Sequence, residues 1–323
     1  DPKYTGMIGM HGTKASNFGV SECDLLIAIG VRFSDRVLGN PKKFAKQAKI
    51  LQIDIDPVEI NKNIIVNHSI IGDVAIVLGK LNEKLEQQKH TEWLSHIADY
   101  QKMYPMTIPK EGLSGPFMIA KIYEMAKDAI MVTEVGQHQM WAAQYYKYTK
   151  PRTLLTSGGL GTMGYGFPAA IGAKLGNPDK DVIAISGDGG MQMNIQEFAT
   201  AVLEELPLIL CVFNNEYLGM VRQWQKLFYG KRYSMTNLKS GALFRRTNGQ
   251  EMPEYTPDFV KLAESYGAKG IRVMKKEDIA AAFEEAKKNT KTPTLIEFVI
   301  NPEELVYPMV QPGGTLEDLI MDC

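Results

Sequence analysis

The sequence predicts an α/β fold in which a partial doubly wound domain is followed by a complete parallel-sheet domain. Short apolar runs such as DLLIAIG and DVIAIS alternate with helix-sized stretches along the 323 residues. This alternation is typical of parallel sheets, whose strands are joined by crossover helices. The first part of the chain contains few such runs, whereas the second part contains enough for a whole sheet.

Two strands are expected in the first part, from DLLIAIG near Asp24 and from KILQIDID, because polar residues or glycine end each run. A helical pattern then runs over residues 74–89. Two strands are few for a doubly wound sheet, so residues 1–90 are expected to be a domain truncated at its N-terminus. Polar residues and prolines over 91–114 indicate a helix and a linker.

Residues 115–323 are expected to form the complete domain and a C-terminal tail. The helix FMIAKIYEMAKD opens it, and strands are predicted at AIMVTEVG, PRTLLTS, DVIAIS, LILCVF, GIRVM and TLIEFVI. Asn194, followed three residues later by Glu197, matches a capping box. That pattern predicts a helix start between DVIAIS and LILCVF.

Composition limits the classes of function. With 36 basic and 37 acidic residues, the chain suggests neither a nucleic-acid surface nor a polyanionic tail. No apolar run approaches the ~20 residues that span a bilayer, so no membrane segment is expected. Cys23, Cys211 and Cys323 are far apart and are expected to be reduced thiols, with Cys211 in the core. A Walker-type nucleotide motif is absent from the sequence.

Two oxygen-bearing clusters follow neighbouring predicted strands: Gly187-Asp188-Gly189 and Asn214-Asn215. One helix-sized stretch separates them, so both are expected at the carboxyl ends of adjacent parallel strands, where α/β sheets bind ligands. Asp188 offers a charged oxygen and Asn215 an amide oxygen, and Mg²⁺ takes such ligands. The glycines, with Gly190, allow the backbone to approach phosphates closely. The pair predicts Mg²⁺ held against a diphosphate; a tight turn after a buried strand would explain the glycines alone.

The spacing of GDG and NN resembles the thiamine diphosphate motif of the ThDP-dependent enzymes. Further segments extend this resemblance: GMHGT from Gly9, GVRFSDR from Gly30, VGQHQMWAAQYY from Val135, SGGLGTMGYGFPAAIGA from Ser157 and GMVRQWQKLFYGKRYS from Gly219. In this order they resemble the large catalytic subunit of acetolactate synthase, also called acetohydroxyacid synthase, over nearly the whole chain. The resemblance implies thiamine diphosphate, Mg²⁺ and FAD as cofactors.

For the thiamine site, the resemblance implies Asp188, Asn215 and the main-chain carbonyl of Tyr217 as Mg²⁺ ligands. Met163 would lie under the bent cofactor, since methionine is apolar and adaptable. Gln137 and His138 would offer donors to a carboxylate or an oxyanion. Ordinary packing is the alternative for Met163 and His138. The other residues expected to contact thiamine diphosphate are Val135, Gly136, Gly161, Gly187, Gly189, Gly190, Gly219 and Met220.

Trp224 is implied to line the substrate entry and to favour 2-oxobutyrate as the second substrate. The alternative is a core stripe on the helix MVRQWQKLF, because Met220, Val221, Trp224 and Leu227 share one face. Arg36 is expected near the mouth of the active site.

The first part of the chain is expected to bind FAD. Its glycine turns let the backbone approach a ligand, and Asp54, which closes a strand, could accept a hydrogen bond from a ribose hydroxyl. Structural turns are the alternative. The expected FAD contacts are Gly9, Met10, His11, Gly30, Val31, Arg32, Phe33, Ser34, Asp54, Ile55, Asp73, Val74, Gly158 and Gly159.

Three departures from the family pattern are visible. Ser34 stands where aspartate is usual, and Gly190 stands where serine is frequent. No segment matches the amino-terminal domain that carries the family's cofactor-activating glutamate. The chain alone is therefore expected to be inactive.

The implied reaction is the decarboxylation of pyruvate and its condensation with a second 2-oxoacid. The products would be 2-acetolactate or 2-aceto-2-hydroxybutyrate, for branched-chain amino acid synthesis. The implied assembly is a homodimer or homotetramer with the site at the subunit interface, with or without a small regulatory subunit. Its implied location is the cytoplasm of a bacterium or an organelle of a eukaryote. The alternatives are another ThDP and FAD enzyme, such as glyoxylate carboligase or pyruvate oxidase, or a catalytically silent cofactor-binding module.

Overall fold

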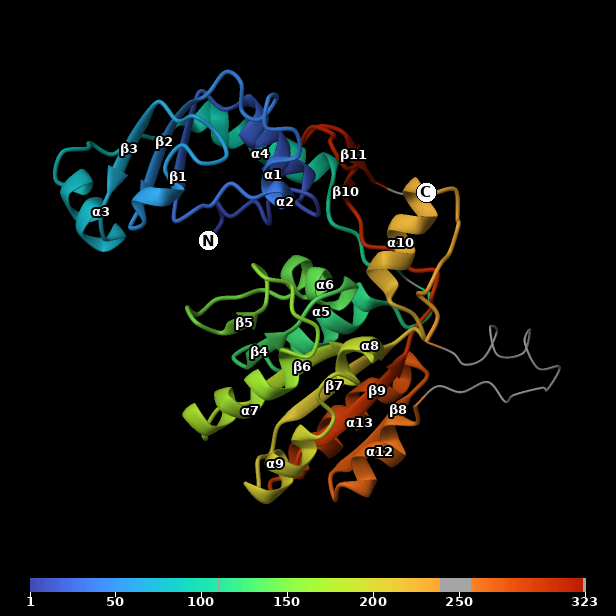
Figure 1. Ribbon diagram of the computed structural model, residues 1–323. Coiled ribbons are helices and arrows are strands. Elements are labelled where there is room, and N and C mark those ends of the chain that lie inside the picture. The colour runs from blue at the N-terminus through green and yellow to red at the C-terminus, as the bar shows by residue number, and fades with distance from the viewer. Residues whose placement is uncertain (110, 239–256, 322–323) are drawn as a thin grey trace. The chain divides into compact units, whose positions relative to one another are not determined.

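The protein divides into two units in a computed structural model that describes residues 1–109, 111–238 and 257–321 (Figure 1). Unit 1 comprises Asp1–Thr107 with Val306–Cys323, and unit 2 comprises Ile108–Leu305. The boundary after Thr107 lies within the range in which the sequence predicts a linker. The division differs from the predicted one at the C-terminus, because the tail contacts unit 1: the amide of Val310 donates to the carbonyl of Met10 over 2.8 Å.

A three-stranded parallel sheet forms the centre of unit 1, in the order β1-β2-β3. The two predicted strands are present, as β1 (Leu25–Ile29) and β2 (Lys49–Asp54), and β3 (His68–Ile71) is an additional one. Two short strands of the tail, β10 (Met309–Val310) and β11 (Leu319–Ile320), pair antiparallel.

The helices of unit 1 begin at identifiable caps. The side chain of Thr13 accepts from the amide of Ser16 at the start of α1 (Lys14–Glu22), and Asp73 accepts from Ala75 and Ile76 at the start of α3 (Val74–Asn82). The helix α3 ends before the predicted residue 89. The segment 91–103, within the predicted linker range, forms α4 (Thr91–Met103), which packs on α1. Shorter elements are α2 (Asp35–Leu38) and η1 (Pro57–Glu59).

Unit 2 contains a six-stranded parallel sheet, in the order β5-β4-β6-β7-β9-β8. All six predicted strands are present, which confirms the fold class. The central strands are buried along almost their whole length, as is usual when helices cover both faces of a parallel sheet. The strands are β4 (Ile130–Thr133), β5 (Leu154–Thr156), β6 (Val182–Gly187), β7 (Ile209–Asn214), β8 (Lys269–Val273) and β9 (Thr294–Val299).

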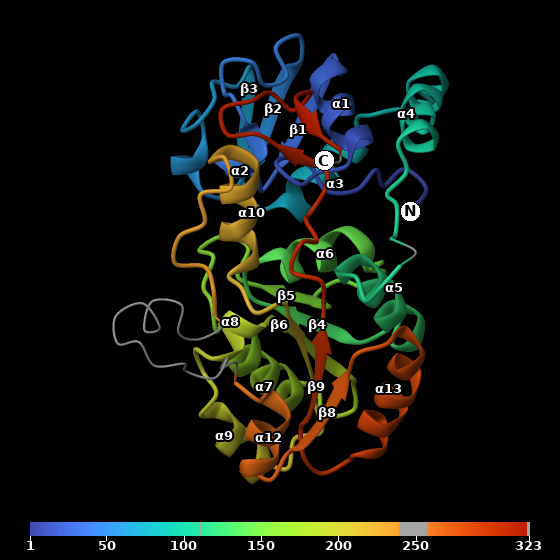
Figure 2. The ribbon, with the colours of Figure 1, turned by 90° about the vertical axis from the view of Figure 1, so that its right-hand side faces the viewer.

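Helices cover both faces of this sheet, as Figure 2 shows. On one face, Phe167 and Phe198 pack with Val132, Ala184 and Leu210 in a continuous apolar core. The helices on that face are α7 (Gly166–Gly176), α9 (Glu197–Leu203) and α12 (Phe259–Ser265). On the other face lie α5 (Gly115–Met125), α6 (Gln137–Tyr145) and α13 (Ile279–Lys288), the last preceded by η2 (Lys276–Asp278).

The predicted capping box at Asn194 is wrong. The helix α9 begins at Glu197 after Gln196, and no side chain caps it. Asn194 instead donates through Nδ2 to the carbonyl of Gly164 over 2.8 Å. Its side chain is therefore used to hold the glycine-rich loop that precedes α7.

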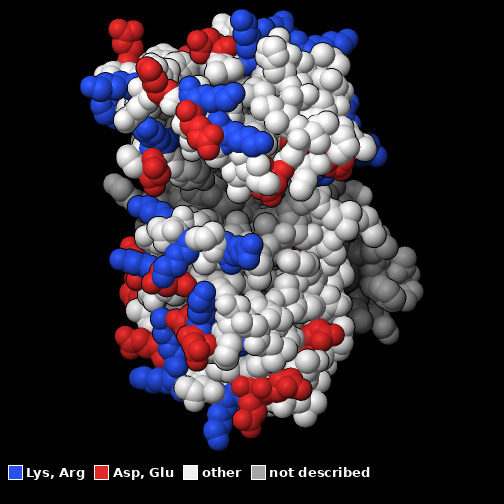
Figure 3. All heavy atoms as spheres, turned by 90° about the vertical axis from the view of Figure 1, so that its left-hand side faces the viewer, with Lys and Arg blue, Asp and Glu red and all other residues white. Residues whose placement is uncertain are grey.

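Three general predictions can be compared with the described residues. Within them, no helix is both long enough and apolar enough to cross a membrane. Cys23 and Cys211 are free, as predicted; Cys211 is buried in the core, also as predicted, Cys23 is buried as well, and Cys323 lies outside the described residues. Figure 3 shows charges of both signs intermixed on one face, and a broad uncharged area on unit 2.

Candidate functional site

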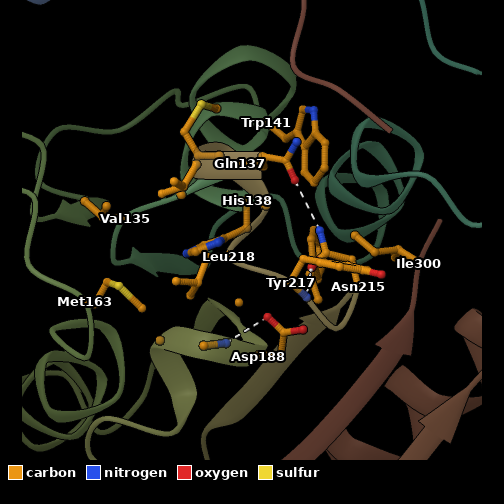
Figure 4. A pocket seen from close by; sticks show the side chains of 18 residues that line it. Val135, Gln137, His138, Trp141, Met163, Asp188, Asn215, Tyr217, Leu218 and Ile300 are labelled. Atoms are coloured by element: carbon orange, nitrogen blue, oxygen red, sulfur yellow. Dashed lines mark hydrogen bonds between the residues drawn. The ribbon is translucent and has the colours of Figure 1, made fainter. Parts of the chain in front are cut away.

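A pocket lies in unit 2 where β4, β6 and β7 end (Figure 4). These strands are neighbours and parallel, so the turns that follow them meet at one edge of the sheet. After β7 the chain turns into α10 (Gly219–Phe228), which adds another wall. The structure gathers thirteen of the predicted residues around this pocket: Val135, Gly136, Gln137, His138, Met163, Gly187, Asp188, Gly189, Gly190, Asn215, Tyr217, Gly219 and Met220.

Asp188 is the buried carboxylate of the pocket and begins the short helix α8 (Asp188–Met191). It is 4% exposed. Its Oδ1 accepts from the amide of Gly189 over 2.8 Å, and its Oδ2 accepts from the amide of Glu216 over 2.5 Å. Burial raises the pKa of Asp188 to about 7, although these amide donors lower it. A buried carboxylate of this kind gains from a cation, which would offset the cost of its desolvation.

Asn214 and Asn215 have different roles. Asn214 points away from the pocket and donates through Nδ2 to Glu297 over 2.7 Å. Asn215 lines the pocket, and its Oδ1 accepts from the amide of Tyr217 over 3.1 Å while its Nδ2 donates to Gln137. The oxygens of Asp188 and Asn215 thus come from the ends of two adjacent strands, as the spacing predicted.

Gln137 has its amide hydrogens already engaged. Its Nε2 donates to Oε1 of Gln223 and to the carbonyl of Glu304, each over 3.0 Å. An amide nitrogen has two hydrogens, so none remains for a substrate oxygen in this arrangement. The geometry supports a role for Gln137 in holding Asn215 rather than the predicted role as a donor to substrate.

His138 is 5% exposed, and burial lowers its pKa to about 3. Its Nε2 has no hydrogen-bond partner among the described residues. A buried polar atom without a partner is costly unless a ligand or water satisfies it. His138 is therefore a neutral group in the pocket lining that is available to a ligand.

The glycines of the turn after β6 leave room that side chains would fill. A Cβ on Gly187 would lie 3.2 Å from Nδ1 of His138, and one on Gly189 would lie 2.7 Å from the Leu218 side chain and 3.4 Å from Cε of Met163. Met163 reaches the pocket from the loop before α7. Apolar walls, an unpartnered imidazole and a buried carboxylate together fit thiamine diphosphate with Mg²⁺.

Three predicted site residues lie outside the set that lines this pocket. Gly161 lies in the preceding loop with a φ of 76°. Trp224 lies half-buried on α10 with its ring 5.5 Å from that of Phe228. Arg36 belongs to unit 1, where its exposed side chain pairs with Asp35 over 2.8 Å.

The alternative interpretation of α10 as a core stripe does not fit. Its buried residues are Arg222 and Gln223, while Val221 is exposed and Trp224 is half-buried. Among the described residues, the buried face of this helix is therefore polar. Arg222 forms an ion pair with Glu303 and donates a hydrogen bond to the carbonyl of Pro302.

Most residues predicted to contact FAD gather at one edge of the sheet in unit 1. Gly30 follows β1, Asp54 ends β2 and Ile55 follows it, and Asp73 and Val74 follow β3. The amide of Gly30 donates to Ile53 and that of Gly72 to Asp54, so these strand ends are adjacent. The neighbouring Val31, Arg32, Phe33 and Ser34 continue from Gly30, and Gly158 and Gly159 belong to unit 2.

Two residues of this set are turned inward. Phe33 is 3% exposed and packs on Phe44 in the core of unit 1. His11 is 5% exposed, and its Nδ1 lies 3.2 Å from the carbonyl of Pro308. Next to His11, the turn of Gly9 and Met10 is tied to Arg36, whose carbonyl accepts from the amide of Met10. Contacts from Phe33 and His11 to a ligand would have to use their backbone.

Other residues that no sequence pattern indicated line the pocket or lie next to it. Glu134 lies directly behind it, bonded to the turns that form it. A glutamate after a strand has no distinguishing spacing. The other residues that were not predicted are apolar, and in the sequence they look like ordinary core residues of strands and helices. Only their positions near strand ends could have indicated a place in the pocket. They are Trp141, Phe213, Leu218, Val221 and Ile300.

Family models match both parts of the chain. The model "Thiamine pyrophosphate enzyme, C-terminal TPP binding domain" matches residues 134–298, which contain all the lining residues of the pocket except Ile300. The model "Thiamine pyrophosphate enzyme, central domain" matches residues 1–81.

Similar proteins are acetolactate synthase large subunits. The subunit from Cyanidium caldarium is 44% identical, and the alignment covers 99% of this chain and 54% of that protein. A probable large subunit from Methanocaldococcus jannaschii is 45% identical, and the alignment covers 99% of this chain and 53% of that protein. The large subunit from Corynebacterium glutamicum is 44% identical, and the alignment covers 98% of this chain and 50% of that protein. The chain thus spans about half the length of these relatives.

Proposed function

Because the chain belongs to the thiamine pyrophosphate enzymes, we propose that its pocket binds thiamine diphosphate through Mg²⁺. Asp188, Asn215 and the main-chain carbonyl of Tyr217 would hold the metal. The observation that carries this proposal is the meeting of Asp188 and Asn215 at adjacent strand ends, within one pocket lined by glycines and Met163. Mg²⁺ usually takes few protein ligands and keeps phosphate and water oxygens as the rest.

The protein's part in the chemistry would be to bind, orient and shield. Thiamine diphosphate, when bound, supplies an electron sink for the decarboxylation of a 2-oxoacid. Met163 and Leu218 would present an apolar surface to the cofactor's rings, while Gln137 holds the amide of Asn215. The neutral His138 would offer one ring nitrogen to a polar atom inside the pocket.

We further propose the acetolactate synthase reaction: pyruvate loses CO₂, and the two-carbon unit joins a second 2-oxoacid. The similarity to acetolactate synthase large subunits along almost the whole chain supports this choice over other ThDP enzymes. The half-buried ring of Trp224, on the helix that also supplies Met220 and Val221 to the pocket, is compatible with a place at the substrate entry.

Calorimetry on the full chain tests the cofactor site. Thiamine diphosphate should bind in the presence of Mg²⁺ and not with EDTA, at about pH 8 where Asp188 is ionised. Asp188→Ala should abolish the Mg²⁺-dependent heat, whereas Asp179→Ala, at an exposed position after α7, should leave it unchanged. Equal binding by wild type and Asp188→Ala would instead favour a silent module.

Product analysis tests the reaction. A protein that carries this sequence together with the family's amino-terminal domain should convert pyruvate to 2-acetolactate. Acetyl phosphate from pyruvate, or tartronate semialdehyde from glyoxylate, would exclude the synthase and indicate an oxidase or a glyoxylate carboligase.

For unit 1 we propose FAD binding at the edge where its three strands end. The exposed Gly30 and Asp73 and the half-buried Asp54 lie close together there. Retention of FAD absorbance after gel filtration would support this site, and Asp54→Ala should reduce the retained flavin. Flavin-free protein after incubation with excess FAD would contradict it.

A second copy of the chain is the proposed partner of unit 2. Leu160 is 91% exposed, and Met193 beside the same glycine-rich loop is 54% exposed. Neighbouring exposed apolar side chains can form a patch through which proteins associate. Sedimentation should show a dimer or tetramer, and Leu160→Asp with Met193→Asp should shift it to the monomer; an unchanged size would exclude this surface.

A further inference from the structure

A buried carboxylate lies behind the pocket. Glu134 follows β4 and is 1% exposed. Its Oε2 accepts a hydrogen bond from the amide of Gly164, and its Oε1 accepts one from the hydroxyl of Ser186. The amides of Gly166 and Gly187 donate to the same carboxylate. One side chain therefore receives donors from two separate segments of the chain.

Both segments shape the pocket. Gly164 and Gly166 belong to the loop that enters α7, and that loop supplies Met163 to the pocket. Gly187 belongs to the turn that carries Asp188. Because Glu134 bonds to both, the separation between the Met163 loop and the Asp188 turn depends on this side chain.

The carboxylate also occupies the space beside Gly190. A Cβ on Gly190 would lie 1.8 Å from Oε1 of Glu134 and 2.3 Å from its Cδ. At Gly187 and Gly189 the nearest atoms belong instead to side chains of the pocket lining, His138 and Leu218. The glycine at 190 is thus required by Glu134, whereas the other two keep the pocket itself open.

Glu134 cannot easily move aside for a side chain at 190. Rotation of its carboxylate would break the hydrogen bond from Ser186, whose hydroxyl also donates to the carbonyl of Gly187 over 3.1 Å, and would leave the buried amide of Gly164 without its acceptor. Its Oε1 lies 3.9 Å from Nε2 of His138, beyond hydrogen-bonding distance. The contacts of Glu134 are therefore with the backbone and Ser186, and not with the pocket's imidazole.

We propose that Glu134 is a positioning residue of the cofactor pocket, which holds the Met163 loop and the Asp188 turn at a set distance and makes glycine obligatory at position 190. This inference rests on the proposed function, since the pocket it shapes is the proposed thiamine diphosphate site. It accounts for a glycine at the position where serine is frequent in the resembling family.

A double-mutant cycle on the full chain tests the pairing without any ligand. The four proteins are wild type, Gly190→Ser, Glu134→Asp and the double variant. Aspartate is one methylene shorter, so it withdraws the carboxylate from position 190. Gly190→Ser should lower the urea midpoint in the Glu134 background and lower it much less in the Asp background. Gly176→Ser, at an open position, should change it little.

Calorimetry with thiamine diphosphate at saturating Mg²⁺ tests the positioning role. Gly190→Ser should weaken binding by about tenfold or more, and adding Glu134→Asp should recover about tenfold. Equal effects of Gly190→Ser in both backgrounds, in either assay, would overturn the inference. If the wild type shows no Mg²⁺-dependent binding, the proposed function is wrong, and Glu134 has no role in cofactor binding. The double-mutant cycle measured by urea unfolding still decides whether residues 134 and 190 are coupled.

Discussion

Nδ2 of Asn215 donates a hydrogen bond to Oε1 of Gln137 over 3.3 Å. This bond fixes which end of the Asn215 amide faces Gln137, so the oxygen of Asn215 points the other way, toward the amide of Tyr217. Figure 4 shows the two side chains directed at one another. Gln137 therefore determines the orientation of a proposed metal ligand.

Replacing Gln137 with alanine should weaken the metal site. Without its acceptor, the Asn215 amide can rotate, and the loss of one buried hydrogen bond corresponds to about a fivefold to tenfold higher Mg²⁺ concentration at half-saturation. Titration of Mg²⁺ into the chain with excess thiamine diphosphate measures this. Gln139→Ala is the matched control, because Gln139 bonds to Thr156 at a distance from the metal ligands. Identical Mg²⁺ dependence of Gln137→Ala and wild type would refute the assignment.

Gly219→Ala should damage the same site by crowding. The added Cβ would lie 2.2 Å from Oε1 of Gln137 and 2.7 Å from Nδ2 of Asn215. Overpacking of this kind costs about 1–3 kcal/mol, which should appear in both the unfolding free energy and cofactor affinity. Gly79→Ala, in the helix α3 with nothing nearby, should instead be neutral or slightly stabilising. Normal cofactor affinity in Gly219→Ala would show that the turn adapts.

The ion pair between Arg272 and Glu297, next to the turn that carries Asn214 and Asn215, should be needed for stability. Glu297 is 2% exposed and accepts from Asn214 and from Nε of Arg272, each over 2.7 Å. Arg272→Met should lower the unfolding free energy by about 2 kcal/mol, less than for a fully buried pair because Arg272 is partly exposed. Adding Glu297→Gln removes the unpaired charge and should restore part of the loss. A double variant less stable than Arg272→Met, measured by urea unfolding, would contradict this reasoning.

The buried His11 should make stability depend on pH. Burial lowers its pKa from 6.5 to about 4, so between these values the unfolded chain binds a proton that the folded chain does not. The contribution of His11 to the unfolding free energy should therefore increase from pH 4 to 6.5, by about 3 kcal/mol in total. The carboxyls of Asp188 and Glu304, whose pKa values burial raises to about 7, act in the opposite direction.

The difference in unfolding free energy between wild type and His11→Gln isolates the pH-dependent contribution of His11. Urea unfolding at several pH values should show the stability advantage of wild type shrinking as pH falls through this range. His68→Gln, at an exposed position on β3, should preserve the wild-type slope. A constant difference between wild type and His11→Gln at every pH would rule out the neutral buried imidazole.

The strands that could be predicted were those with a continuous apolar run. Leu210, Cys211 and Val212 in β7 are buried on both faces of the sheet, which produces such a run. The strand β3, which contains His68 and Ser69, has no such signal, because its residues are exposed or half-buried. The two-residue strands β10 and β11 pair with one another, and Val310 of β10 also bonds to Met10, and local sequence does not encode such tertiary contacts.

Residues of the candidate site could be predicted where a recognisable sequence separation relates two of them. A single side chain without such a pattern could not be predicted. Asp188 and Asn215 were found because a single helix-sized stretch, which the structure divides into α8 and α9, separates two apolar strands. Glu134 was missed since its four donors come from residues 30 to 53 positions away in sequence. The capping prediction at Asn194 failed for a related reason: the loop at Gly164 competes for the same side chain.

The polar underside of α10 has a consequence for how this wall of the pocket is attached. Arg222 lies between the rings of Tyr217 and Tyr233, 4.7 and 4.6 Å from their centroids, and pairs with Glu303. Attachment through charge is weakened by salt, unlike attachment through an apolar face. We therefore expect amide hydrogen exchange in α10 to accelerate in 1 M salt while the amides of α7 stay protected. Salt would then loosen the attachment of α10 without affecting the core of unit 2.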